Sequence, residues 1–285
     1  MKIETSRIRA GLLAISLLSM LWGYRLMLLD HAPTVFAGEM EDMSYGWYVP
    51  LFSVYVLWRE RGELLRSLGA PSGWGFLLLA PAALAGFLGI RGHQLRLEIV
   101  GFAATLVAVA WIHYGGRTAR RVLFPAAFLL FCMPLATFLD VVTVHLRLLA
   151  VAVASSVLSG LGVDVVRCGT MLASASGAFS IDVAEPCSGL RSLFAMMALT
   201  AGYAYFNQPT WPRRALLFAL SIPIAILGNV ARILSIALVG SLCSPTFATG
   251  FYHDYSGYVI FLFAIALMLL TNGLITWGAE RCARR

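Results

Sequence analysis

The segment Asp182–Ser192, with the sequence DVAEPCSGLRS, carries the densest group of reactive side chains in the chain. A strand-like run ends at Glu185, and Pro186 suits the first turn of the apolar helix that follows. Cys187 and Ser188 are then predicted at a helix N-terminus, where free backbone N–H groups and the positive end of the helix dipole favour an anion. A thiol at that position is expected to be more acidic than a free thiol.

Two further features support a reactive Cys187. Arg191 follows one helical turn later, where it could assist a thiolate. The free N–H groups of the same helix start could also bind an oxyanion. The alternative is that Cys187 is a small buried apolar residue, as most cysteines are.

Arg232 is a charged residue inside the apolar segment 215–240. A charge near the centre of a membrane helix costs roughly 2.5–3.5 kcal/mol on insertion scales, so it normally faces a cavity lined by protein. Asn229, Arg232 and Ser235 recur at intervals of three residues and form one polar stripe on this segment. The alternative is a structural arginine that snorkels outward or pairs with an acid such as Glu185.

His253 lies in the segment FYHDYSGYVIF, beside Asp254. Imidazole is the natural proton carrier near neutral pH. The alternative is an aromatic belt at the membrane interface that includes a histidine without a chemical role. If successive apolar segments cross the membrane in turn, Cys187, Arg232 and His253 meet near one membrane surface. A thiol, a base and a fixed cation are the minimum set for cysteine acyl transfer.

The composition indicates the architecture that must position these residues. The chain has 285 residues, of which 60% are hydrophobic and 12% charged, whereas soluble domains carry about 25% charged residues. The apolar residues form blocks long enough to cross about 30 Å of hydrocarbon. We therefore predict an all-α polytopic integral membrane protein, one domain over residues 1–285, with about eight transmembrane helices at 10–29, 43–58, 74–90, 97–114, 122–139, 188–206, 215–240 and 257–277.

Clusters of basic residues predict the orientation. Of the 21 Lys and Arg residues, fourteen fall on one side of the membrane if there are eight crossings, and the positive-inside rule makes that side cytoplasmic. Both termini are then cytoplasmic, and the acidic loop 30–42 is outside. The fourteen are Lys2, Arg7, Arg9, Arg59, Arg61, Arg66, Arg117, Arg120, Arg121, Arg213, Arg214, Arg281, Arg284 and Arg285.

The longest stretch without a predicted span is 140–187. Residues 141–162 are apolar enough to cross, but a crossing there would move Arg213 and Arg214 outside. We therefore expect an interfacial or re-entrant helix on the outer face. Residues 166–184 contain Gly, Ser and β-branched residues, which predict a short β-like hairpin on the same face.

The remaining candidates indicate no other chemistry. The five cysteines include no CxxC pair, so they predict neither a disulfide framework nor a zinc site. No nucleotide or metallopeptidase motif is present, and we expect no cofactor, no metal and no nucleic-acid partner. His31, His93 and His113 are isolated in the sequence and are interpreted as interfacial residues.

At these positions the sequence resembles the exosortase/archaeosortase family of membrane transpeptidases. Four matching blocks lie in order along the chain: FPAAFLLFCMPL at 124–135, EPCSGLRSL at 185–193, IPIAILGNVARI at 222–233 and HDYSGY at 253–258. The core motifs of the resemblance span 185–261.

The resemblance implies a catalytic set of Cys187, Arg232 and His253. Archaeal members have arginine where this chain has His253, so the chain is similar to the bacterial branch. Supporting or substrate-binding roles are expected for Glu185, Ser188, Arg191, Asn229, Asp254 and Ser256.

The resemblance also implies the substrates and the location. The substrates are secreted proteins ending in a short motif such as Pro-Glu-Pro, an apolar helix and a basic cluster. The enzyme would lie in a bacterial inner membrane, among lipids, with its site facing the periplasm, and would pass the protein to an acceptor, often in bacteria that make exopolysaccharide. The sequence leaves open the motif, the acceptor and the oligomeric state. Two alternatives are a transporter or flippase and a non-catalytic component of exopolysaccharide export.

Overall fold

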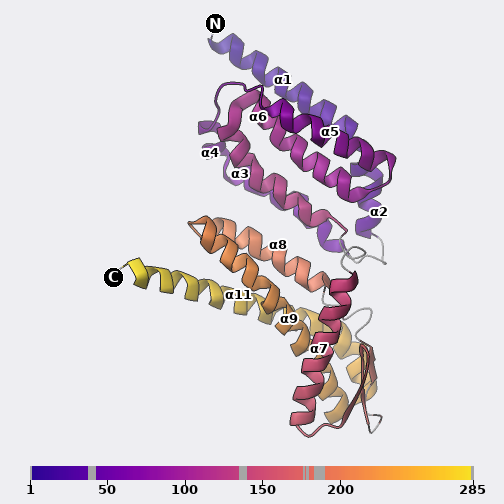
Figure 1. Cartoon of the computed structure of the whole chain (residues 1–285). Coiled ribbons are helices and arrows are strands. Elements are labelled where there is room, and N and C mark those ends of the chain that lie inside the picture. The colour runs from indigo at the N-terminus through magenta and orange to yellow at the C-terminus, as the bar shows by residue number, and fades with distance from the viewer. Residues whose placement is uncertain are drawn as a thin grey trace. The chain divides into compact units, whose positions relative to one another are not determined.

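The computed structural model describes residues 2–37, 43–134, 140–175, 177, 180–182 and 190–283 (Figure 1). The chain divides into two compact units, Met1–Leu135 and Ala136–Arg285. Each unit has its own packed interior and is described by itself.

The first unit consists of helices. Its elements are α1 (Lys2–Gly23), η1 (Met27–His31), α2 (Ala32–Ala37), η2 (Ser44–Trp47), α3 (Tyr48–Arg59), α4 (Arg61–Arg66), α5 (Gly75–Arg91), α6 (Leu95–Phe128) and η3 (Leu129–Cys132).

Gly115 breaks α6 into two helical parts, with φ 80° and ψ 176°. Only glycine adopts this conformation without strain. The loop before α5 packs against the break, since the backbone N–H of Gly69 donates to the Tyr114 carbonyl over 3.0 Å and that of Ser72 to the Ile112 carbonyl over 3.1 Å. The break falls between the two predicted spans 97–114 and 122–139, where the sequence predicted that one helix ends and the next begins.

Close glycine contacts hold α5 against α6. A Cβ placed on Gly101 would lie 2.5 Å from the Gly86 backbone nitrogen and 2.7 Å from the Tyr24 hydroxyl oxygen. A Cβ on Gly89 would lie 2.7 Å from the backbone nitrogen of Glu98. No side chain fits at these points, so the two backbones approach as closely as small residues in membrane helices allow.

The second unit combines helices with a small sheet. Its elements are α7 (Asp140–Gly160), β1 (Val165–Cys168), β2 (Met171–Ser174), β3 (Ser180–Asp182), α8 (Leu190–Asn207), α9 (Trp211–Leu242), α10 (Pro245–Phe247), η5 (Ala248–Tyr252) and α11 (His253–Ala283). The strands form an antiparallel sheet in the order β1-β2-β3, with Val166 opposite Ala173 and Leu172 opposite Ile181. The predicted hairpin is therefore present, and a third strand extends it.

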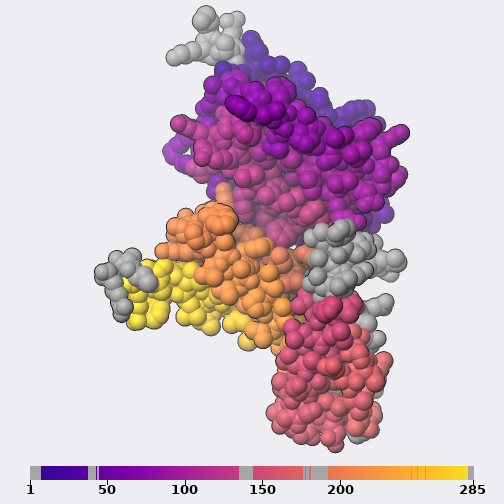
Figure 2. Space-filling view, viewed as in Figure 1, coloured from indigo at the N-terminus to yellow at the C-terminus, as the bar shows by residue number. Residues whose placement is uncertain are grey.

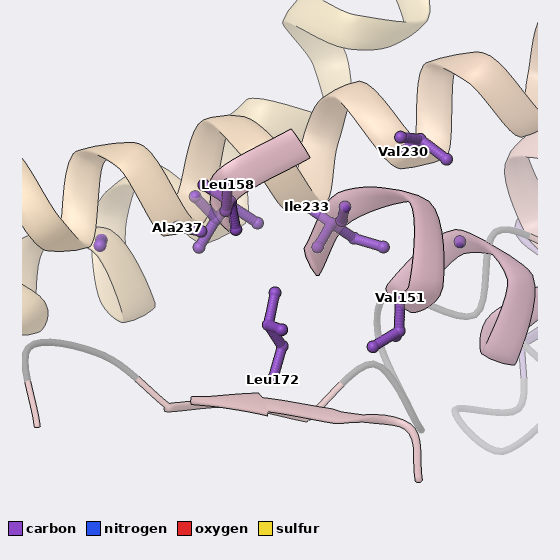
Figure 3. Packing of buried hydrophobic residues seen from close by; sticks show 10 residues of the cluster. Val151, Leu158, Leu172, Val230, Ile233 and Ala237 are labelled. Carbon is purple, nitrogen blue, oxygen red and sulfur yellow. The ribbon is translucent and has the colours of Figure 1, made fainter. Parts of the chain in front are cut away.

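One face of α9 packs on α7 and the sheet (Figure 3). Ala150, Val151, Ala154 and Leu158 recur at helical spacing on α7, and each is at most 1% exposed. Leu172 of β2 reaches from the sheet into the same cluster, whose α9 members include Ile233 and Ala237. The predicted helix at 141–162 is thus present and packed on one side; its place relative to the membrane stays a prediction.

Another part of α9 packs against α8 and α11. Met196, Leu217, Ile224 and Met268 belong to this second apolar cluster, and the Thr200 hydroxyl donates to the Met268 sulfur over 3.1 Å. Figure 2 shows the C-terminal part of α11 beside α8 and α9 at one end of the unit, and α7 with the sheet at the other. Helix α9 therefore joins the two apolar clusters.

Within the described residues, three helical stretches are long and apolar enough to cross a membrane: Leu95–Cys132, which includes the break at Gly115, Trp211–Leu242 and Gly250–Arg281. The bent pair Ile8–Gly23 and Met27–Ala37, with 57° between its parts, gives a fourth if it is one span. Helix α3 has only 12 residues, or about 18 Å, and α5 has 17, or about 26 Å. The structure therefore shows a multi-pass helical membrane protein, and the number of eight crossings stays a prediction.

Candidate functional site

Arg232 of α9 binds the first turn of α11. Its Nε donates to the Ser256 hydroxyl oxygen over 3.3 Å, and its Nη2 donates to the His253 carbonyl oxygen over 3.1 Å. The Ser256 hydroxyl, 2% exposed, also donates to the His253 carbonyl over 3.1 Å. The planar guanidinium is thus held in one orientation by two neighbouring acceptors, a geometry that lysine does not reproduce.

The local backbone explains how a guanidinium reaches α11. The π-helical turn η5 precedes His253, and Gly250 within it has the non-helical angles φ −98° and ψ −111°. A Cβ placed on Gly257 would lie 3.4 Å from the Arg232 Cζ. The guanidinium therefore lies against the α11 backbone at Gly257.

A pocket of about 40 Å³ opens beside Arg232, between α8, α9 and α11. Its polar lining comes from Arg232, Asn229 and Ser192, and the rest is small or apolar. The full lining is Ser192, Met196, Ala225, Gly228, Asn229, Arg232, Gly257, Ile260, Phe261 and Ala264. A residue with a fixed cation and an asparagine thus line a small opening.

Several predicted site residues lie outside the described residues. They are Glu185, Cys187 and Ser188, and the side chains of Arg191 and Asp254 are likewise not described. Of the predicted set, the structure brings together Arg232, His253 and Ser256, and it places Asn229 in the same pocket. Ser192, five residues after Cys187 in the sequence, also lines this pocket.

An aromatic ladder, defined as Phe247, Phe251, Tyr255 and Tyr258, runs along the exposed side of α10, η5 and the start of α11. Successive ring centroids are 5.9, 4.5 and 6.4 Å apart, and the four side chains are 45–72% exposed. Near the other end of α11, the Arg281 guanidinium lies 3.9 Å from the Trp277 ring centroid. Rings at both ends of an apolar helix are typical of a membrane span.

Sequence reasoning missed a second polar cluster, which lies in the first unit. The Glu98 side chain is fully buried, and its Oε1 lies 2.7 Å from His31 Nδ1. The ring of His93 lies 5.1 Å from that of His31. His31 and His93 are therefore not isolated in space, and His31 is only 14% exposed. Among the described residues, no group of three His, Cys, Asp or Glu side chains is arranged to hold a metal ion.

The long apolar helices define the class of protein as a multi-pass membrane protein with a polar site between its last helices. A family model described as transmembrane exosortase matches residues 37–270. The chain therefore belongs to the transmembrane exosortase family, and all the described residues of the Arg232 site lie inside the match. No curated protein and no solved structure matches the chain. Membership of this family indicates a transpeptidase-like role.

Proposed function

We propose that the chain is a membrane-embedded cysteine transpeptidase that cleaves a C-terminal sorting signal of secreted proteins and transfers them to an acceptor. The observation that carries this proposal is the fixed guanidinium of Arg232, held on the first turn of α11 beside a pocket. Family membership supplies the class of reaction. The cation meets the need of acyl transfer for a group that stabilises a developing oxyanion.

The reaction would proceed through a thioester. The Cys187 thiolate attacks the scissile carbonyl carbon, and the carbonyl oxygen becomes an oxyanion that Arg232 stabilises. His253 accepts the thiol proton and returns it to the leaving amine, so the peptide bond breaks as the thioester forms. An acceptor nucleophile or water then attacks the thioester and releases the thiol.

The contacts around Arg232 support this division of roles. Because the His253 carbonyl and Ser256 hydroxyl fix the guanidinium, it does not have to reorient when the oxyanion forms. Because Arg232 holds the His253 backbone, the imidazole is attached to a fixed point near the cation. Asn229, in the same pocket, and Ser188 are proposed to orient these groups.

The proposed setting is the bacterial inner membrane, with the site at its periplasmic face. The substrate's apolar tail would lie in the bilayer beside α8, α9 and α11, with its basic cluster in the cytoplasm. This arrangement would bring the short motif before the tail to Cys187. Glu185, Arg191 and Asp254 are proposed to contact this motif.

The test is co-expression with a tagged reporter bearing such a tail from the same genome. Wild type should shorten the reporter on a gel, and Cys187→Ala should abolish the shift while inserting normally. Cys168→Ala is the matched control, because Cys168 is an exposed free thiol on β1. Equal processing by wild type and Cys187→Ala contradicts the mechanism. Lipid or solute transport that is unaffected by Cys187→Ser, without processing of any tail, would favour a transporter or flippase instead.

A further inference from the structure

We propose that the pocket between α8, α9 and α11 receives the side chain of the substrate residue that supplies the scissile carbonyl, and that it admits only small side chains. This inference rests on the proposed function and adds a specificity to it. Gly228 and Ala264 are the residues that set the size limit.

In the proposed reaction, Arg232 holds the scissile carbonyl beside the pocket. Arg232 lines the pocket, its guanidinium lies against Gly257, another lining residue, and in the proposed reaction it binds the carbonyl oxygen of the scissile bond. The side chain of that residue is attached one atom away from the carbonyl carbon. A carbonyl bound at Arg232 therefore brings this side chain within reach of the pocket, whose other walls include Asn229 and Ile260.

The volume of the pocket limits the side chain that it can receive. The pocket has about 40 Å³, whereas an engineered apolar cavity that binds benzene has about 150 Å³. We therefore expect the space to suit side chains from alanine to valine and to exclude a phenyl ring.

Gly228 keeps one wall of the pocket free of a side chain. A Cβ placed there would lie 3.6 Å from the Ile260 Cγ2 and 3.7 Å from the Ala264 Cβ, which is ordinary van der Waals contact. No close helix packing requires glycine at this point. Its effect is to leave space in the pocket next to Arg232, and a methyl group added there would occupy space that the substrate needs.

The experiment uses reporters that differ only in the residue at the scissile carbonyl, after the cleavage point has been mapped by mass spectrometry of the released tail. Gly, Ala, Val and Phe are placed at this position. Wild type should process the first three and should process Phe at least about tenfold more slowly, because excluding a few methylenes is worth that much. Gly228→Ala and Gly228→Val should lose the Val reporter progressively and retain the Gly reporter.

The matched control is Gly273→Ala, a helical glycine of α11 with nothing within 4 Å of an added Cβ; it should change no ratio between reporters. Ala264→Gly should act in the opposite sense and improve processing of the Phe reporter. If Gly228→Ala lowers processing of all reporters by the same factor, or changes none, the pocket is not the subsite. If no reporter is processed in a Cys187-dependent way, the proposed function itself fails and the subsite with it.

Discussion

The two units use glycine between helices in opposite ways. In the first unit, a Cβ on Gly101 would lie 2.5 Å from the backbone of the neighbouring helix, and a Cβ on Gly89 would lie 2.7 Å from the Glu98 backbone nitrogen. In the second unit, added Cβ atoms on Gly228 and Gly257 would lie 3.4 Å or more from their neighbours. Glycine thus brings helices together in one unit, whereas in the other it leaves space beside a cation.

The two units also differ in whether space lies beside their ionisable residues. Glu98 is fully buried and hydrogen-bonded to His31, so its ionisable group is enclosed by the fold. Arg232 is half-buried and forms part of the wall of a pocket. The comparison teaches that an ionisable residue inside a membrane protein indicates a ligand site only where space for the ligand lies beside it.

The largest expected effect is on activity in the second unit. Arg232→Lys should lower reporter processing by about 10²–10³-fold, the usual effect of removing one donor to an oxyanion, because an ammonium cannot bind Ser256, the His253 carbonyl and the substrate with one planar group. The Tm in detergent should change little. Arg281→Lys, at an exposed position on α11, is the control and should retain activity. If Arg232→Lys kept full activity, the guanidinium would not serve the reaction, and Arg232 would not differ from Glu98 in serving a ligand site.

The next effect is on stability in the first unit. Gly101→Ala should destabilise the fold by about 2–3 kcal/mol, because the added methyl meets backbone atoms that cannot move aside. A fall in Tm of roughly 5–10 °C in detergent is expected. Gly11→Ala, in the same unit with nothing within 4 Å of an added Cβ, should leave the Tm unchanged or raise it. Equal Tm values for both variants would show that close packing at Gly101 is unimportant.

The smallest effect concerns the buried acid. His31→Ala should destabilise by about 1–2 kcal/mol, since Glu98 is left without its partner, and the activity of the folded fraction should be retained. His113→Ala provides a comparison, because His113 is half-buried and shares one hydrogen bond of 2.9 Å with Ser16. A loss of processing in His31→Ala without a fall in Tm would instead assign the His31–Glu98 pair a role in the reaction.

The sequence predicts local structure well where a run of apolar residues determines a helix or where glycine falls at a break. Apolar blocks predicted the positions of α5, α8, α9 and α11 to within a few residues at most ends. The GlyGly pair at 115–116 lies where α6 breaks, between two predicted spans. The Gly, Ser and β-branched residues of 166–184 indicated a hairpin, but the three-stranded order depends on pairing between segments and was not predicted.

The meeting of Arg232 and His253 could be predicted from the sequence, whereas the contacts between them could not. The consecutive helices α9 and α11 bring Arg232 and the His253 backbone together, as expected from alternating spans, and the predicted place of Cys187 beside them lies outside the described residues. The guanidinium, however, binds the His253 carbonyl, which directly follows the turn η5, and the sequence pattern did not predict this contact. The pairing of His31 with Glu98 was missed because 67 residues separate them, and no local periodicity reports such a contact.

The rings at the two ends of α11 have a consequence for membrane thickness. Tyr255 of the aromatic ladder and Trp277 are 22 residues apart, or about 33 Å along a helix, close to the roughly 30 Å of a hydrocarbon core. In the proposed setting, rings of this kind would settle at the headgroup level and would place His253 within one turn of the lipid surface. A bilayer with longer acyl chains would draw this end of the helix below the headgroups or force it to tilt. Lipid chain length would then control access of the proposed acceptor to Arg232 without altering any contact inside the protein.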